Sequence, residues 1–523
     1  MRCATCSTRG RADRRQATGK TIMIRRTFLA ATAIAGLATG MMPVLAHAQD
    51  GQTLDVAIVS DPVTLDPALM ASFFELAVQY NIFEPLLHTT PELEIEPGLA
   101  SYEMPDETTY VLTIKDGLTF HDGTTLDAEA VKANLDRYMD AETGSPRGSE
   151  LGPLDSVEVT GPLEVTLKLS EPYAPFLQVL ANRAGMMVSP TALEELGDDF
   201  ATQAVGAGPY KVASWTKNSE LRLEAFEDYW RGEPAIDEVV FRPIPDETVR
   251  INNLRSGTVQ LVDGVPPQLV PQVESDESLT LKETPGLGFN AFSFNTTAAP
   301  FDDARVRRAF SMAVDPEVIL QAAYFGAATP AKGAIPPSIG WAYDDSLEAP
   351  RNDPEGARQL LEEAGVEMPV SVEITVTNSP IYVRIAQILQ AQANEVGFDV
   401  SINQIDSTSL ITVLRERTSD LTMSPWSGRS DPDGNIFNYF TIDGPNNFPG
   451  WENEEVDRLL NEARVETDQA ARAELYGQAQ QIIADEAPLL FLVFPQMLQA
   501  SVADLDWTQW PDGAFRLQFA TME

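Results

Sequence analysis

Cysteine is almost absent from this chain of 523 residues: the two that occur, Cys3 and Cys6, stand at its very beginning. They form a CxxC pair with no second pair, ahead of what reads as an export signal, so we interpret them as neither a metal site nor a redox site. Once that signal is removed, disulfide bonds, iron–sulfur centres and a lipidated N-terminal cysteine are excluded. Histidine is also scarce, with three in all, which argues against a zinc site. We expect no cofactor and no metal.

Positive charge is the second shortage. The chain holds 36 Lys and Arg against 78 Asp and Glu. The first 48 residues contain eight of the basic residues and one Asp, so 28 basic and 77 acidic residues remain beyond them, a net charge of −49. Such a surface repels phosphate backbones and anionic lipids, so nucleic acid is not an expected partner.

Long hydrophobic runs are missing except near the N-terminus. From Met23 the chain has a two-arginine head, an apolar middle and a small-x-small end at Ala46-His47-Ala48. This pattern predicts an export signal within residues 1–48, cleaved near Ala48/Gln49, with the true start at Met23. The product would be a periplasmic protein without a lipid anchor. The twin-arginine and general secretion routes both remain open.

Alternating strand and helix patterns fill the rest of the chain and predict an α/β fold. The clearest unit is a strand at 370–378, a helix at 381–396 and a strand at 398–405, which we expect to form a parallel crossover. Other expected elements are a helix at 73–87, a helix opened by Thr124, acidic helices at 453–465 and 468–485, and a buried strand at 488–494. A length of about 475 residues after the leader predicts at least two lobes.

The segment 423–451 is the most distinctive part of the chain. It contains Trp426 and Trp451, with Arg429 between Trp426 and the acidic turn at Asp431 and Asp433. Turn-forming residues mixed with aromatic residues favour a surface loop that meets a ligand. The simpler interpretation is a structural loop anchored by tryptophan.

Several ordered blocks resemble the peptide/nickel family of ABC-transporter solute-binding proteins, family 5. They run through almost the whole chain beyond the leader: YNIFEPLLHTTPELEIEPGLA, YVLTIKDGLTFHDGTTLDAEAVKANLDR, GAGPY, FEDYWRGEPAIDEVVF, FNTTAAPFDDARVRRAFSMAVD, DPEGARQLLEEAG and WSGRSDPDGN. The GAGPY block has Ala207 where the family usually has threonine, and Pro316 replaces a usual arginine. Six or more blocks in order are specific for the family and much less specific for the ligand.

The resemblance implies a periplasmic-binding-protein type 2 fold, with two lobes that close over a ligand about a hinge. Lobe I would comprise 49–86, 196–285 and 490–523, with an inserted subdomain at 87–195, and lobe II would be 286–489. It further implies a monomeric receptor that delivers its solute to an inner-membrane ABC permease and its ATPase complex. A receptor of this kind is not an enzyme. The enzyme motifs GxSxG, HExxH and the P-loop are also absent from the sequence.

The ligand is the open question. In peptide-binding relatives an aspartate three residues after the loop tryptophan pairs with the free amine of the peptide, but here that position is Arg429. Either Asp431 or Asp433 takes the amine, or Arg429 selects an anion, or Arg429 simply pairs with one of those acids. The expected ligand is therefore a peptide or peptide-like molecule, with an opine-like, glutathione-like or sugar-derived anion as the alternative. A periplasmic chaperone or hydrolase is more remote.

The predicted ligand contacts are drawn from two segments. They are Trp426, Ser427, Gly428, Arg429, Asp431, Asp433 and Tyr439 in the loop, and Gly208 and Tyr210 in GAGPY. His121, in the HDG block, is interpreted as part of a turn rather than as a metal ligand.

Overall fold

The computed structural model describes residues 51–70 and 75–523, in which the chain from Gly51 to Glu523 forms one unit. The export signal predicted within residues 1–48 lies outside the described residues and stays a prediction. Within the described residues no helix is both long and apolar enough to cross a membrane.

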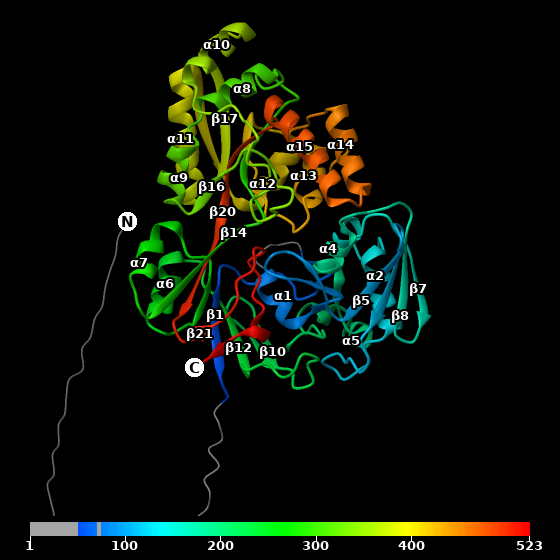
Figure 1. Cartoon of the computed structure of the whole chain (residues 1–523). Coiled ribbons are helices and arrows are strands. Elements are labelled where there is room, and N and C mark those ends of the chain that lie inside the picture. Colours follow the sequence, from blue (N-terminus) through cyan, green and yellow to red (C-terminus); the bar gives the residue numbers. More distant parts are fainter. Residues whose placement is uncertain (1–50, 71–74) are drawn as a thin grey trace, which may run out of the picture. The chain divides into compact units, whose positions relative to one another are not determined.

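A sheet of twelve strands is the central element (Figure 1). Ten of its strands form a continuous path: β10 (Tyr210–Thr216), β11 (Glu220–Ala225), β12 (Glu238–Pro243), β1 (Thr53–Ile58), β13 (Leu261–Asp263), β20 (Leu489–Val502), β15 (Asn290–Phe294), β19 (Leu421–Met423), β17 (Val370–Thr377) and β18 (Phe398–Ile405). The other two, β14 (Leu279–Pro285) and β16 (Ala328–Pro330), pair with β20.

β20 links the two halves of this sheet. Its C-terminal part pairs with β14, where Pro285 lies opposite Gln496, and with β13. Its N-terminal part pairs with β15, where Asn290 lies opposite Val493, and with β16. The chain therefore passes from one half to the other at 286–289, and the long strand passes back beside it. Figure 1 shows β20 running from the helix-rich half to the half that contains β1.

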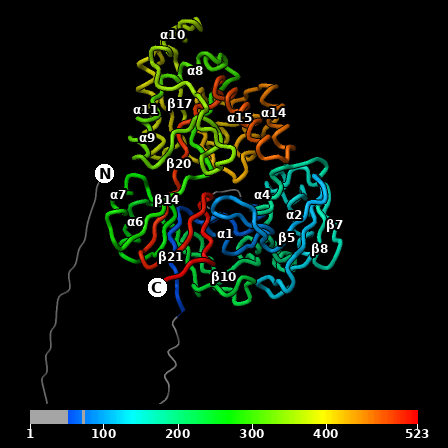
Figure 2. The backbone as a smooth tube through the Cα atoms, viewed as in Figure 1, coloured from blue at the N-terminus to red at the C-terminus, as the bar shows by residue number. Residues whose placement is uncertain are grey.

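Residues 100–169 form a separate antiparallel sheet, coloured blue to cyan in Figure 2. Its strands, in spatial order, are β5 (Ala100–Asp106), β6 (Thr109–Ile114), β8 (Glu164–Leu169) and β7 (Leu154–Gly161). Short two-stranded sheets are made by β3 (Leu87–Thr89) with β4 (Ile95–Pro97), β2 (Glu84–Pro85) with β9 (Met186–Met187), and β21 (Leu505–Asp506) with β22 (Thr521–Met522). The hydrophobic cluster of this region, around Phe120, Leu135 and Phe176, is distinct from the cluster around β1.

The helices cover the sheets with apolar faces, as their periodic patterns predict. The α-helices before the crossing are α1 (Leu76–Ile82), α2 (Ala128–Met139), α3 (Arg147–Glu150), α4 (Phe176–Leu180), α5 (Pro190–Leu196), α6 (Glu247–Arg255) and α7 (Val270–Glu274). Those after it are α8 (Ala304–Ala313), α9 (Pro316–Tyr324), α10 (Pro354–Ala364), α11 (Pro380–Val396), α12 (Leu410–Glu416), α13 (Asp433–Phe440), α14 (Glu454–Val465) and α15 (Gln469–Glu486).

The predicted unit β17–α11–β18 is present, and its two strands pair in parallel from Val370–Phe398 to Thr377–Ile405. Two other expectations need correction. The helix α2 is capped by Asp127, whose side chain accepts from the backbone N–H of Ala130, rather than opened by Thr124. The helix expected at 73–87 is shorter, since α1 covers Leu76–Ile82, and its predicted first residues, 73 and 74, lie outside the described part.

The segment 423–451 is not the exposed loop that its turn residues indicate. Within it only Asp443 and Pro445 are exposed, and residues 433–440 form the helix α13. Ile436, Tyr439 and Phe440 recur at helical spacing and are all buried, so apolar burial overrides the local turn preference of Asp-Pro-Asp-Gly.

Candidate ligand-binding site

The tryptophan segment is fastened to the crossing between the two halves of the sheet. Phe289 and Trp426 exchange backbone hydrogen bonds of 3.1 and 2.9 Å. Asn435, fully buried on α13, accepts from the Trp426 indole N–H at 2.9 Å and from the Arg429 backbone N–H at 2.8 Å. Its amide group also donates to the Leu287 carbonyl at 3.2 Å. Asn435 thus fixes the path of the chain from Trp426 to Arg429.

Gly428 makes this path possible. Its φ of +83° lies in the region that favours glycine, and a Cβ there would overlap the carbonyl group of Leu287. The close approach of two backbones therefore sets the direction in which the next side chain, Arg429, leaves the segment.

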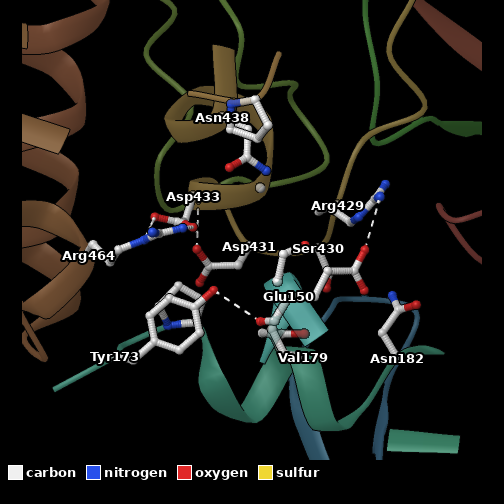
Figure 3. A pocket seen from close by; sticks show the side chains of 15 residues that line it. Glu150, Tyr173, Val179, Asn182, Arg429, Ser430, Asp431, Asp433, Asn438 and Arg464 are labelled. Carbon is white, nitrogen blue, oxygen red and sulfur yellow. Dashed lines mark hydrogen bonds and ion pairs between the residues drawn. The ribbon is translucent and has the colours of Figure 1, made fainter. Parts of the chain in front are cut away.

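Arg429 lies over Trp426 and points toward residues from the other half of the structure. Its guanidinium is 4.7 Å from the Trp426 ring centroid, and its Nη2 donates to Glu150 Oε1 at 3.4 Å (Figure 3). Glu150 ends α3, far away in the sequence. The alternative that Arg429 pairs with Asp431 or Asp433 is therefore wrong for this structure, because the carboxylate it contacts is that of Glu150.

Glu150 lies among three arginines. Arg147 Nη1 donates to both of its carboxylate oxygens at 2.9 Å, and Arg429 approaches from the opposite wall. Burial alone would raise the pKa of Glu150, but the Arg147, Arg429 and Arg183 guanidiniums outweigh it and lower that pKa. The carboxylate is therefore ionised at neutral pH.

Arg183 is the third member of this group and has no counter-ion of its own. The residue is 3% exposed, and its Nε has no hydrogen-bond partner. In the part of the chain that the structure describes, no carboxylate lies within ion-pair distance of its guanidinium. Burial, with the nearby charges of Arg429 and Arg147, lowers the pKa of Arg183 to about 9. The group of Arg147, Arg183, Arg429 and Glu150 thus carries an excess of positive charge.

Asp431 and Asp433, by contrast, are each held by a dedicated arginine of α14 or α15. Arg472 binds both carboxylate oxygens of Asp431, at 3.0 and 2.7 Å. Arg464 binds those of Asp433, at 3.0 and 2.9 Å. Burial raises the pKa of Asp433, and the Arg464 charge opposes that shift.

Two cavities flank the segment 426–429. The first, of about 110 Å³, includes Arg429, Asp431, Asp433 and Arg464 on one side and Glu150 and Tyr173 on the other (Figure 3). The second, of about 550 Å³, is largely apolar. Its lining includes Trp426, Ser427, Tyr439, Ile411, Tyr382 and Met497.

Gly208 and Tyr210 line neither of these two cavities. Tyr210 is fully buried in the cluster around β1, and its hydroxyl donates to the Leu517 carbonyl at 3.3 Å. A Cβ on Gly208 would collide with the backbone of Ile82, so this glycine serves close packing. His121 makes hydrogen bonds through both ring nitrogens, from Nε2 to the Gly208 carbonyl at 2.9 Å and to Nδ1 from the Gly206 N–H at 3.3 Å.

Sequence reasoning missed four residues that shape this region: Arg147, Glu150, Arg183 and Asn435. Nothing local marks the first three, since isolated charged residues in an acidic chain are ordinary. Asn435 follows Asp433-Gly434 and looks like one more turn residue. The roles of these four residues follow only from their positions in the fold.

Comparisons with known proteins give one consistent result. Residues 94–448 match the bacterial extracellular solute-binding proteins, family 5 Middle. The glutathione-binding protein GsiB of Escherichia coli (strain K12) is 30% identical over 507 residues, covering 93% of this chain and 98% of that protein. The periplasmic binding protein DppA from Helicobacter pylori, solved with the peptide STSA, has a TM-score of 0.81 at 26% identity, covering 90% of this chain and 98% of that one.

The substrate-binding protein CtaP from Listeria monocytogenes has a TM-score of 0.83 at 24% identity, covering 91% of this chain and all of that one. This similarity is one of fold.

Proposed function

This chain belongs to the bacterial extracellular solute-binding proteins of family 5, the receptors of ABC importers, and from that premise we propose that it captures a small peptide-like solute with carboxylate groups. Its relatives are binding proteins rather than enzymes, and DppA among them is a periplasmic one. We propose that it works in the same compartment and hands its ligand to an inner-membrane permease.

The observation that carries the proposal is the buried Arg183 guanidinium, for which residues 51–70 and 75–523 supply no ion-pair partner. Leaving a buried charge unpaired is unfavourable by several kcal/mol, so such a group persists where a ligand supplies the opposite charge. Arg147, Arg183 and Arg429 together face the single carboxylate of Glu150, while Glu75 acts on Arg147 from further away. Arg429 lines the smaller cavity, so a ligand carboxylate there would form charge-assisted hydrogen bonds with Arg429 and balance the charges of Arg147 and Arg183 behind it.

Glutathione is the first ligand to test. The relative GsiB is named for binding it, and it is a tripeptide with two carboxylates and one amine. Its charged ends suit an arginine-rich site, and the apolar cavity beside Trp426 has room for the remainder of a peptide-like molecule. An opine-like or sugar-derived anion would use the same arginines and is the alternative for the same experiment.

We further propose that binding closes two lobes, with lobe I made of 49–86, 196–285 and 490–523, the insertion at 87–195, and lobe II of 286–489. The strand pairing supports a hinge at 286–289 and beside it in β20, a few residues beyond 490. Arg183 and Arg429 would then lie on different lobes. A ligand that contacts both would favour the closed form, because it gains free energy only when both walls are present.

The test is calorimetric titration of glutathione, a neutral sugar and a lysine-rich peptide into the protein produced from Met23 and isolated from the periplasm. Its intact mass also checks cleavage before Gln49. We expect binding of glutathione alone, and a loss of about ten-fold or more in affinity for Arg183→Gln. The free energy of unfolding of the unliganded variant should be unchanged or higher, because an unpaired buried charge is gone.

Arg458→Gln is the matched control, since Arg458 is an exposed arginine of α14 that pairs with Glu455 and Glu462 of the same helix. It should bind like the wild type. Undiminished binding to Arg183→Gln, or wild-type preference for the cationic peptide, would overturn the proposal of an anionic solute.

A further inference from the structure

The three carboxylates that line the smaller cavity are not equivalent. Asp431 and Asp433 each receive two hydrogen bonds from one arginine of their own half of the structure. Arg472 and Asp431 are both nearly buried, at 5% and 8% exposure. Drawing Asp431 toward a ligand would strip the buried Arg472 of its partner, which is strongly unfavourable. Drawing Asp433 away would break both hydrogen bonds to Arg464, whose side chain is 24% exposed.

Glu150 is held differently. One nitrogen of Arg147 is shared between its two oxygens, and the contact with Arg429 is long, at 3.4 Å. A carboxylate has about four lone-pair positions, so this arrangement leaves acceptor capacity. The side chain is 24% exposed and lines the cavity. Glu150 is therefore the acid beside this cavity that can accept a new donor without breaking a two-bond pair with a buried arginine.

We propose that Glu150 is a specificity-determining residue that selects solutes carrying an ammonium group together with a carboxylate. This inference rests on the proposed function. The ligand carboxylate takes the guanidinium of Arg429, which lines the cavity, with the charge of Arg183 behind it, and Glu150 keeps Arg147 while it accepts a hydrogen bond from the ligand ammonium. This arrangement is the reverse of a site in which an acid of the loop binds the ligand amine. Here the loop supplies the cation, Arg429, and the opposite wall supplies the anion, Glu150.

The affinity for ligands with and without an ammonium group distinguishes this role from that of a simple internal counter-ion. If Glu150 only neutralised the arginines, it would compete with every ligand carboxylate and lower the affinity for all anions by the same factor. If Glu150 binds the ligand ammonium, it lowers the affinity for anions that lack an ammonium group and raises the affinity for those that have one. The two roles predict different responses to removal of the amine from the ligand.

The experiment measures dissociation constants of glutathione and N-acetylglutathione, which keeps both carboxylates and lacks the ammonium, for the wild type and Glu150→Gln. We expect the wild type to prefer glutathione by about ten-fold or more, a typical effect of a close charge pair. In Glu150→Gln this preference should disappear, with N-acetylglutathione bound at least as well as by the wild type. The glutamine still accepts from Arg147, so the variant should fold, which its melting temperature checks.

Arg429→Gln is the comparison at the other end of the same ion pair. It should weaken both tripeptides and keep the preference between them. If Glu150→Gln changes both affinities by the same factor, or retains the preference, the role of Glu150 is overturned while the proposed function stands. If the wild type binds neither tripeptide nor any other carboxylate tested, the proposed function fails and this inference fails with it.

Discussion

Asp263 shows how a single buried acid makes stability depend on pH. It lies on β13, 7% exposed, and burial raises its pKa to about 6 against the opposing effects of Arg250 and Gln499. Below about pH 4 the acid is protonated in both the folded and the unfolded chain and contributes nothing. Between about pH 4 and 6 the unfolded state ionises first, so folding loses free energy as the pH rises, and the loss is complete above pH 6.

Asp263→Asn should therefore stabilise the protein at pH 7.5 by roughly 2–3 kcal/mol, and the gain should vanish below about pH 4. Urea unfolding of both proteins across this pH range measures the difference. Asp228→Asn, at an exposed site, serves as the control with little change at any pH. A gain for Asp263→Asn that is constant with pH would mean that ionisation of Asp263 is not its cause.

Residue-scale prediction from the sequence was strongest for neighbours in the chain. Trp426 and Arg429 were both predicted as ligand contacts of one segment, and the Arg429 guanidinium lies 4.7 Å from the Trp426 ring centroid. Glu150 and Arg183 were not foreseen beside Arg429, because no periodicity or motif connects positions so far apart. Asp431 and Asp433 looked available in the sequence, yet arginines of later helices hold both. The charge of a pocket is a tertiary property, and one sequence does not reveal which opposite charges will meet.

At the scale of elements, Gly428 and Gly477 offer a matched pair of substitutions. Gly428→Ala introduces a Cβ at a φ of +83° and against Leu287, so we expect destabilisation of at least about 2 kcal/mol and weakened ligand binding as Arg429 is displaced. Gly477 lies within α15 with open space where its Cβ would be, so Gly477→Ala should stabilise by about 0.5–1 kcal/mol.

Chemical denaturation and ligand titration of the two variants provide the comparison. Gly477→Ala should leave the affinity unchanged, because the added Cβ would lie in open space. A Gly428→Ala protein that is as stable as the wild type and binds as well would show that the close approach to Leu287 does not position Arg429.

Elements with a regular pattern were predictable, and elements defined by their partners were not. The alternation of β17 and β18 and the 17-residue apolar pattern of α11 identified the crossover nearly to its ends. β20 was expected to end at 494 but extends to Val502, through Pro495 and several polar residues. Those residues adopt a strand because β14 and β13 pair with them. Likewise α13 forms from a turn-like sequence because its apolar face is buried.

At the scale of the whole molecule, the strand β20 connects the two halves of the sheet, and the candidate site draws residues from both. Alternating elements indicated the α/β class, and the family blocks implied the type 2 binding-protein fold that the solved relatives share. The boundaries of the lobes stay a proposal, since pairing along β20 is continuous across them. A measurement on the protein with and without ligand shows whether the two lobes move apart when the ligand is absent.

Small-angle X-ray scattering of the protein with and without glutathione addresses this movement. If the ligand joins Glu150 and Arg429 across the lobes, the radius of gyration should fall toward about 23 Å, the value for a compact globule of some 475 residues. The forward scattering should correspond to a monomer in both states. Arg429→Gln should bind more weakly and, at equal saturation, contract less, because one wall has lost its contact. Saturating, tight binding by the wild type with an unchanged radius would contradict closure and leave a preformed site as the mechanism.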